Sequence, residues 1–334
     1  MRESLERRGL VEPQVPRPET LHRILGYRPS DDGFVARREH PLDAARVIVD
    51  ESSMVDVRLM FQLFEALEPD ARLVLVGDPD QLPSIEAGAA FRDLVESHPE
   101  AVSTLQENLR VAASEGAREI ADLAGRMREG RELRLRTVQD FPHPDADGVF
   151  FLETGPADRR RWLVFCEQSG TSRIILTPTR EGPVGSDAIN AALRSAHAGS
   201  AGTAGWIDGQ PLMITKNLYT LDLYNGDLGR ARLAAGGRAE AVFRSGTVER
   251  SFDLGAIAAY VRSADAMTVH KAQGSEFDCV LIQLPARPHP LVSRELLYTA
   301  VTRARRQVIL IGSQDSLHAG ARRSLARRTS ARIR

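Results

Sequence analysis

The sequence predicts an α/β protein built on parallel sheets, and three observations lead to this prediction. Short β-branched runs alternate with amphipathic helical patterns, first between residues 46 and 96 and again from residue 114 onward. Acidic or polar residues follow directly after several of these runs. From residue 206 to 262 the pattern changes to short alternating runs separated by glycine-rich turns, which is typical of an inserted antiparallel unit.

The stretch RVIVDESS, residues 46–53, is the first that carries chemistry. Its apolar run ends in Asp50 and Glu51, and the next apolar run ends in GDPDQ, which includes Gln81. Because parallel strands end at the same edge of a sheet, the two polar loops are expected side by side. Nucleotide hydrolysis uses one carboxylate for Mg²⁺ and another to activate water. The alternative is that Asp50 and Glu51 merely cap the helix that follows.

Composition limits the function classes. The chain has 334 residues, 42% of them hydrophobic, a net charge of −1 and a pI near 6.7. This length allows two domains, and the charge balance excludes a global basic field, so any nucleic-acid contact must be local. Two cysteines fit a reducing compartment, and no apolar run is long enough for a membrane span. We therefore expect a cytoplasmic protein without a membrane partner.

The lysine positions are informative. The chain has only Lys216 and Lys271, and neither follows a glycine. A phosphate-binding P-loop needs Gly-Lys-Ser/Thr at the start of a helix, where the lysine meets the phosphates and the hydroxyl meets Mg²⁺. The sequence therefore holds the second half of a nucleotide-hydrolysis site without the first.

Five stretches carry a family resemblance. DESSM and GDPDQLPS resemble motifs II and III of the superfamily-1 DNA helicases, TVHKAQGSEFD resembles motif V, and YTAVTRAR resembles motif VI. REGPVG, residues 180–185, is similar to a segment of the RecD family in particular. The resemblance covers essentially the whole chain, with the motifs in family order.

The resemblance implies an architecture. It divides the chain into a truncated first RecA-like domain, residues 1–100, and a second RecA-like domain, residues 101–204 and 264–334. An SH3-like β insert would occupy residues 205–263. It implies that the chain begins inside the first motor domain. A parallel sheet that lacks its leading strands is expected to expose an edge and apolar faces.

The resemblance also assigns roles around ATP and Mg²⁺. Asp50 would hold Mg²⁺ without a P-loop Ser/Thr, Glu51 would activate water and Gln81 would sense the γ-phosphate. Arg110 and Arg303 would stabilise the transition state, although Arg110 can equally be a solvated arginine before a helix. The remaining residues near the nucleotide would be Gln273, Gly274 and Glu276.

The resemblance places a second set of residues on single-stranded DNA. Motif V would contribute Thr268 and His270, and the segment TLHRILG would contribute Thr20 and His22. Thr20 is also a good N-cap, which is the plain structural alternative. In the insert, Lys216 and Asn217 are candidates for phosphate contacts.

The function implied is an ATP-dependent 5′–3′ DNA helicase of the RecD type. It would act in recombinational double-strand-break repair within an exodeoxyribonuclease V complex, beside RecB- and RecC-like subunits. Because the P-loop is absent, we expect the chain alone to be inactive. Three explanations stay open: a C-terminal part of such a helicase, a non-catalytic module that binds single-stranded DNA or docks subunits, or a motor whose P-loop comes from another chain.

Overall fold

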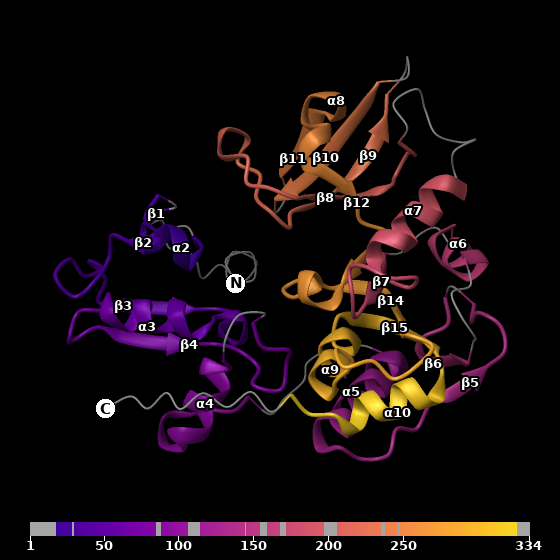
Figure 1. Ribbon diagram of the computed structural model, residues 1–334, viewed down its shortest axis with the longest axis horizontal. Coiled ribbons are helices and arrows are strands. Elements are labelled where there is room, and N and C mark those ends of the chain that lie inside the picture. Colours follow the sequence, from indigo (N-terminus) through magenta and orange to yellow (C-terminus); the bar gives the residue numbers. More distant parts are fainter. Residues whose placement is uncertain are drawn as a thin grey trace. The chain divides into compact units, whose positions relative to one another are not determined.

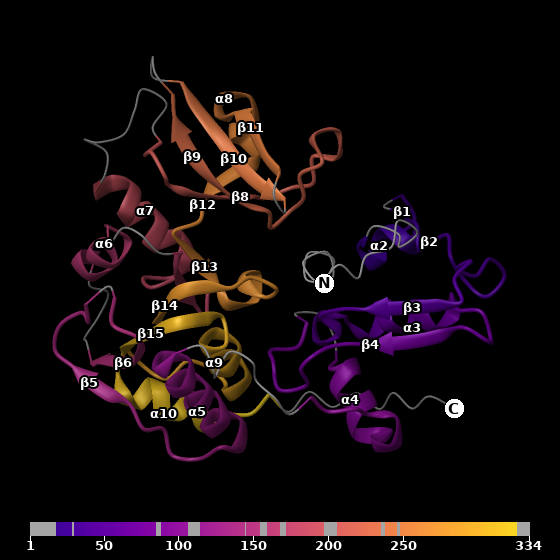
Figure 2. The ribbon, with the colours of Figure 1, turned by 180° about the vertical axis from the view of Figure 1, so that it is seen from behind.

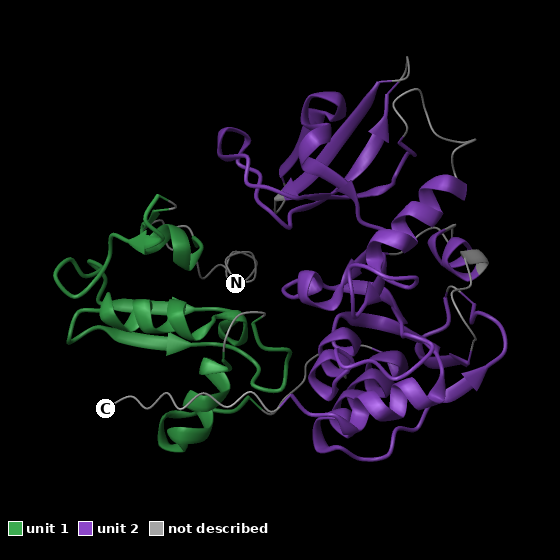
Figure 3. Cartoon of the chain, viewed as in Figure 1, with its two compact units in different colours: residues 1–106, 326–334 green, residues 107–325 purple. Residues whose placement is uncertain are grey.

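The computed structural model describes most of the chain in two compact units. Unit 1 comprises residues 1–106 and 326–334, and unit 2 comprises residues 107–325 (Figure 3). The described residues are 18–28, 30–84, 88–105, 114–143, 145–153, 159–167, 172–196, 206–234, 238–245 and 248–325. The boundary between the units falls six residues after the predicted one, and the functional assignment of the domains stays a prediction.

Unit 1 is a small α/β unit with a two-stranded parallel sheet (Figure 1). Val49 of one strand pairs with Leu75 of the other, so the strands end together. One face of the sheet packs on a helix around the fully buried Leu63. The elements are α2 (Leu21–Ile24), β1 (Tyr27–Arg28), β2 (Gly33–Phe34), β3 (Arg46–Val49), η1 (Ser52–Met54), α3 (Val57–Glu65), β4 (Arg72–Leu75), α4 (Ala90–Ser97) and η2 (Pro99–Ala101).

Apolar side chains on the other face of this sheet are exposed. Ile48 is 55% exposed, Val74 is 49% exposed and Val76, just after β4, is 43% exposed. Parallel sheets are normally covered on both faces, because a β-branched side chain in water forgoes the stabilisation of burial. The expected exposure of apolar faces in the first domain is thus confirmed for the described part of unit 1.

Unit 2 contains a six-stranded parallel sheet with the order β13-β7-β14-β15-β6-β5. Helices α6 and α7 cover one face, while α5, α9 and α10 cover the other (Figures 1 and 2). This arrangement explains why the central strand β14 is almost entirely apolar. The elements are α5 (Glu115–Glu129), β5 (Arg136–Val138), β6 (Gly148–Glu153), α6 (Arg159–Glu167), β7 (Arg173–Thr177), α7 (Ser186–Ala196), β13 (Ala266–Thr268), η6 (Val269–Ala272), β14 (Phe277–Gln283), α9 (Arg294–Val301), β15 (Ala304–Gly312) and α10 (Gln314–Arg322).

A five-stranded antiparallel sheet is inserted between α7 and β13. Its order is β11-β10-β9-β8-β12, and it has a hydrophobic core of its own that includes Leu212 and Phe243. The alternating pattern predicted this sheet, while its SH3-like form stays a prediction. The elements are β8 (Pro211–Ile214), η4 (Tyr219–Leu221), β9 (Leu228–Leu233), β10 (Ala239–Ser245), β11 (Val248–Asp253), α8 (Leu254–Ile257), η5 (Ala258–Tyr260) and β12 (Val261–Ser263).

The α/β class with parallel sheets is confirmed. Among the described residues, no helix combines the length and the apolar character that crossing a bilayer demands.

The packing of unit 2 predicts unequal costs for two identical substitutions. Val280 is fully buried in β14, whereas Val164 lies exposed on α6. Val280→Ala should lower the free energy of unfolding by about 1.5–3 kcal/mol, because it removes buried methyl groups and leaves a cavity. Val164→Ala, the control, should change it by less than about 0.5 kcal/mol. Urea unfolding followed by tryptophan fluorescence measures both, since Trp162 is buried in unit 2 against the opposite face of the same sheet, next to Cys279 and Leu281. Equal costs would contradict this packing.

Candidate nucleotide-hydrolysis site

The turn after β3 sets the position of the predicted carboxylates. Glu51 has φ 52° and ψ 41°, a left-handed conformation that is unfavourable for residues other than glycine. Two bonds from Ser52 hold the turn: its hydroxyl donates to the Val49 carbonyl at 3.0 Å, and its N–H donates to the Val76 carbonyl at 2.8 Å. The second bond joins the loop after β3 to the loop after β4.

The alternative that Asp50 and Glu51 serve as helix caps is wrong. The cap of α3 is Asp56, whose Oδ1 accepts from the Leu59 N–H at 2.9 Å. Glu51 precedes η1 and makes no side-chain capping bond there. Asp50 Oδ1 accepts from the neighbouring Glu51 N–H at 3.0 Å, and the Asp50 side chain is exposed. Both carboxylates are therefore available for chemistry at the carboxyl edge of the sheet.

The loop after β4 brings Gln81 to the same edge. Asp78 shapes this loop, because its Oδ1 accepts from the Asp80 N–H at 3.0 Å and its Oδ2 accepts from the Gln81 side-chain amide at 3.4 Å. The sequence reasoning assigned no role to Asp78. The sequence Asp78-Pro79-Asp80 could have indicated this role, because an aspartate side chain commonly accepts from the backbone N–H two residues later in an Asx turn.

The two loops approach closely. A Cβ on Gly77 would lie 3.1 Å from the Ser53 backbone nitrogen and 3.0 Å from the Phe91 ring, so a glycine fits best there. Among the described residues, Ser53 Oγ and Gln81 Oε1 are buried and have no hydrogen-bond partner. Unpaired buried polar atoms are costly, so a bound polar group that paired with them would stabilise this edge.

The edge fits Mg²⁺ and a nucleotide only in part. Magnesium is usually held by one or two carboxylates together with phosphate oxygens and water, and Asp50 and Glu51 can supply the carboxylates. The described residues contain no group of three or more His, Cys, Asp or Glu side chains that would hold a metal alone. The P-loop lysine and hydroxyl are missing from the sequence, so the phosphates lack their usual cradle.

Arg303 is buried within unit 2. Its Nε donates to the Thr299 carbonyl at 3.2 Å, and its Nη1 donates to the Ser275 carbonyl at 3.3 Å. The Phe277 N–H in turn donates to the Arg303 carbonyl at 2.9 Å. Arg303 thus ties motif VI to the end of motif V, and its predicted role at the transition state stays a prediction.

The residues predicted near the nucleotide in motif V gather around that link. Gln273 ends η6, and Gly274 has φ +76°, which a glycine adopts without strain. The Glu276 carboxylate forms an ion pair with Arg305 at 3.0 Å. Arg110 lies outside the described residues, so its predicted role is not placed.

The start of motif V lies at the opposite edge of the parallel sheet. β13 ends at Thr268, which pairs with Thr177 at the end of β7, whereas Phe277 begins β14. The connection that contains η6 therefore runs from the carboxyl ends of the strands to their amino ends, and it separates Thr268 and His270 from Glu276. Burial lowers the pKa of Lys271 in η6, and repulsion from Arg262 and Arg180 lowers it further. Arg180 is itself paired with Glu181 at 3.4 Å and with Asp187 at 3.2 Å, so the positive charge near Lys271 is partly offset.

The remaining predicted DNA contacts occupy ordinary structural positions. Thr20 is the N-cap of α2, as the alternative expected, with its Oγ1 accepting from the Arg23 N–H at 3.4 Å. Asn217 organises its loop, donating to the Tyr219 hydroxyl at 3.0 Å and accepting from the Asn225 N–H at 2.9 Å. His22 and Lys216 are exposed. Their DNA contacts stay predictions.

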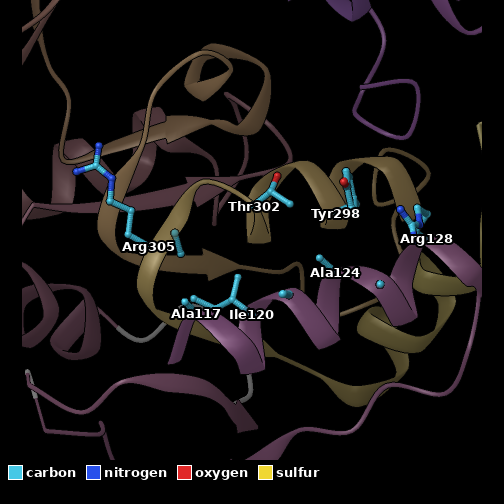
Figure 4. A pocket seen from close by; sticks show the side chains of 10 residues that line it. Ala117, Ile120, Ala124, Arg128, Tyr298, Thr302 and Arg305 are labelled. Carbon is cyan, nitrogen blue, oxygen red and sulfur yellow. The ribbon is translucent and has the colours of Figure 1, made fainter. Parts of the chain in front are cut away.

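A separate pocket of about 250 Å³ lies in unit 2 between α5 and the segment from α9 to β15 (Figure 4). Small side chains of α5, such as Ala117 and Ala124, form its floor, while Tyr298 and Thr302 face them. It is smaller than usual ligand pockets, and none of the predicted nucleotide-site residues lines it. We therefore do not assign it to the nucleotide.

The left-handed turn predicts an inverted preference between glycine and alanine. Glu51→Gly should make unit 1 more stable than Glu51→Ala by about 1 kcal/mol, because only glycine adopts this conformation without steric cost. At Phe61, exposed in the middle of α3, alanine should instead be better than glycine by about 1 kcal/mol. Hydrogen exchange of the amides in β3 and α3 measures both differences. The same order at the two positions would show that Glu51 is not held in this conformation.

Comparisons with known proteins agree with the arrangement of the motifs. A model described as an AAA domain matches residues 17–142, and one described as a UvrD-like helicase C-terminal domain matches residues 263–311. The crystal structure of Pif1 helicase from Candida albicans has a TM-score of 0.52 and 16% identity, covering 90% of this chain and 81% of that one. At this identity the likeness shows the fold alone.

Curated relatives are more similar in sequence. The RecBCD enzyme subunit RecD of Mycolicibacterium smegmatis is 34% identical over 94% of this chain and 58% of its own length. The Mycobacterium tuberculosis subunit is 36% identical over 94% of this chain and 57% of its own. The ATP-dependent RecD2 DNA helicase of Deinococcus radiodurans is 34% identical over 93% of this chain and 42% of its own length. The chain thus spans a little over half the length of the first two relatives. By these similarities and its own motifs, the chain belongs to the RecD family of superfamily-1 helicases.

Proposed function

We propose that this chain is part of an ATP-driven motor that moves along single-stranded DNA. The observation that carries the proposal is the carboxyl edge of the sheet in unit 1. There Asp50 and Glu51 make no helix-capping bond, and their loop is joined to the loop that contains Asp78 and Gln81. An AAA-type and helicase-type family match supports nucleotide use in general. Bound ATP would supply the transferable phosphoryl group and Mg²⁺ would neutralise its charge.

Each residue at this edge has a separate task in the proposal. Asp50, the more exposed carboxylate, would hold Mg²⁺. Glu51 would accept a proton from the attacking water, because its carboxylate makes no helix-capping bond and is available as a base. Gln81, with an unpaired amide oxygen, would respond to the γ-phosphate. The resemblance adds Arg303, which belongs to unit 2, and Arg110, both of which would offset negative charge on the transferred group.

The DNA side of the proposal rests on unit 2. Thr268 and His270 precede Lys271 along the chain, and a phosphate bound there would offset the repulsion that Lys271 receives from Arg262 and Arg180. Lys216 adds an exposed cation on the inserted sheet. Because the net charge of the whole chain is −1, such local clusters are the physical basis for binding a polyanion.

The missing P-loop sets the limit of activity. Charge-assisted contacts to phosphate are among the strongest in such sites, and their loss weakens both nucleotide affinity and orientation. We infer that the 334 residues alone do not turn over ATP. The relatives named as RecBCD subunits support a place beside RecB- and RecC-like partners in double-strand-break repair, with exodeoxyribonuclease V activity belonging to the whole assembly.

A second candidate function is a non-catalytic module that binds single-stranded DNA and docks subunits. The exposed sheet face of Ile48, Val74 and Val76 favours it, because an apolar face of this kind suits a protein partner. The two functions differ in one property. DNA binding by the module would not respond to nucleotide under any condition, whereas DNA affinity of the motor would change once its phosphate cradle is restored.

The test restores the missing element. In a chain with a P-loop segment fused ahead of residue 1, Glu51→Ala should lower the turnover number for ATP at least about 100-fold, because it removes the general base. Single-stranded-DNA binding should persist. Glu68→Ala, at an exposed acid of the same unit, is the matched control and should keep turnover. Turnover retained by Glu51→Ala would refute the assignment of the base.

A further inference from the structure

Three aromatic rings gather on the segment before β3. Tyr27 of β1 and Phe34 of β2 are direct cross-strand partners, with ring centroids 5.3 Å apart. His22 of α2 lies against both, 5.3 Å from Tyr27 in an edge-on arrangement and 6.1 Å from Phe34. Tyr27 is 37% exposed and His22 is also exposed, so the cluster is open to solvent rather than enclosed.

The Tyr27 ring is held from its far end. Its hydroxyl donates to Asp32 Oδ1 at 2.8 Å, and Arg58 Nη1 donates to Asp32 Oδ2 at 2.6 Å. This contact raises the pKa of Tyr27, so the phenol stays protonated and keeps donating. A ring fixed before binding loses little conformational entropy when a ligand stacks on it.

The same contact fixes where the cluster lies in unit 1. Arg58 belongs to the first turn of α3, which begins shortly after β3 ends in Asp50 and Glu51. In a β-strand followed by a helix, the start of the helix lies at the carboxyl edge of the sheet. The cluster is therefore at the end of unit 1 that carries the two catalytic carboxylates.

The charges around the cluster cancel. Arg23 pairs with Glu19 at 3.3 Å, Arg28 pairs with Asp31 at 3.0 Å, and Arg58 pairs with Asp32. Each arginine thus has an acidic neighbour, which makes the segment a poor binder of phosphates. Exposed Ile24 and Val35 flank the rings instead. The surface suits a flat, uncharged, partly apolar group better than an anion.

We propose that Tyr27, with His22 and Phe34, forms a stacking platform for unpaired bases of single-stranded DNA. The proposal rests on the proposed function, and it adds a base contact to the phosphate contacts of unit 2. Aromatic stacking accepts any base and needs no counterion release. Its contribution to affinity is therefore independent of salt, unlike that of Lys271.

The test uses the full 334-residue chain and a fluorescein-labelled oligo(dT). Tyr27→Leu should weaken binding about 5- to 150-fold, which corresponds to about 1–3 kcal/mol for one stacked base. The ratio of Kd values, variant to wild type, should be the same at low and high salt. Tyr27→Phe keeps the ring and should bind nearly as wild type does. Phe61→Leu is the matched control, because Phe61 is an exposed aromatic residue of the same unit outside the cluster, and this variant should bind unchanged.

A second readout does not depend on a folded variant. Ultraviolet crosslinking of wild-type protein to an oligonucleotide of 5-iodouracil should label the tryptic peptide 24–37, which carries Tyr27 and Phe34 because trypsin does not cut before Pro29. Two results would overturn the platform and leave the proposed function standing. One is DNA binding by the wild-type protein without this crosslink, and the other is equally tight binding by Tyr27→Leu. Wild-type protein that binds no single-stranded DNA would overturn both.

Discussion

One hydrogen bond, from the Ser52 N–H to the Val76 carbonyl, organises the candidate site. It joins the loop after β3 to the loop after β4 and sets the turn that places Glu51 in a left-handed conformation. The parallel pairing of Val49 with Leu75 brings both loops to one edge, and the lack of a side chain on Gly77 lets them approach. The carboxylates, Asp78 and Gln81 meet there for these reasons.

Both units contain a parallel sheet, but among the described residues helices cover both faces only of the six-stranded sheet in unit 2. Motif V begins at the carboxyl end of β13 and ends at the amino end of β14, so its two ends lie at opposite ends of the strands. In unit 1 two strands leave one apolar face in solvent. The sequence has no P-loop, and the structure has an exposed apolar sheet face beside the loops that a P-loop would serve. These two features together lead us to propose a motor that needs a further polypeptide segment to bind phosphate.

Sequence patterns predicted most strands of the parallel sheet, because buried strands such as β7 and β14 are continuous apolar runs between polar loops. They also predicted the edge with Asp50, Glu51 and Gln81, since strand order along the chain places those loops together. They missed the aromatic cluster, because Tyr27, His22 and Phe34 meet only through a tight hairpin and the anchor from Arg58. They missed the burial of Arg303 for a related reason: one of its carbonyl partners, Ser275, lies in the connection between η6 and β14 and is distant in the sequence.

The most direct measurement is single-stranded-DNA-stimulated ATP hydrolysis by the purified 334-residue chain, with Arg303→Ala as the control. The account predicts no turnover together with DNA binding that weakens as salt rises, because the carboxylates and DNA contacts are present and the phosphate cradle is not. Turnover by the unmodified chain that Arg303→Ala abolishes would contradict it. Such a result would mean that these residues bind and orient the phosphates without a P-loop.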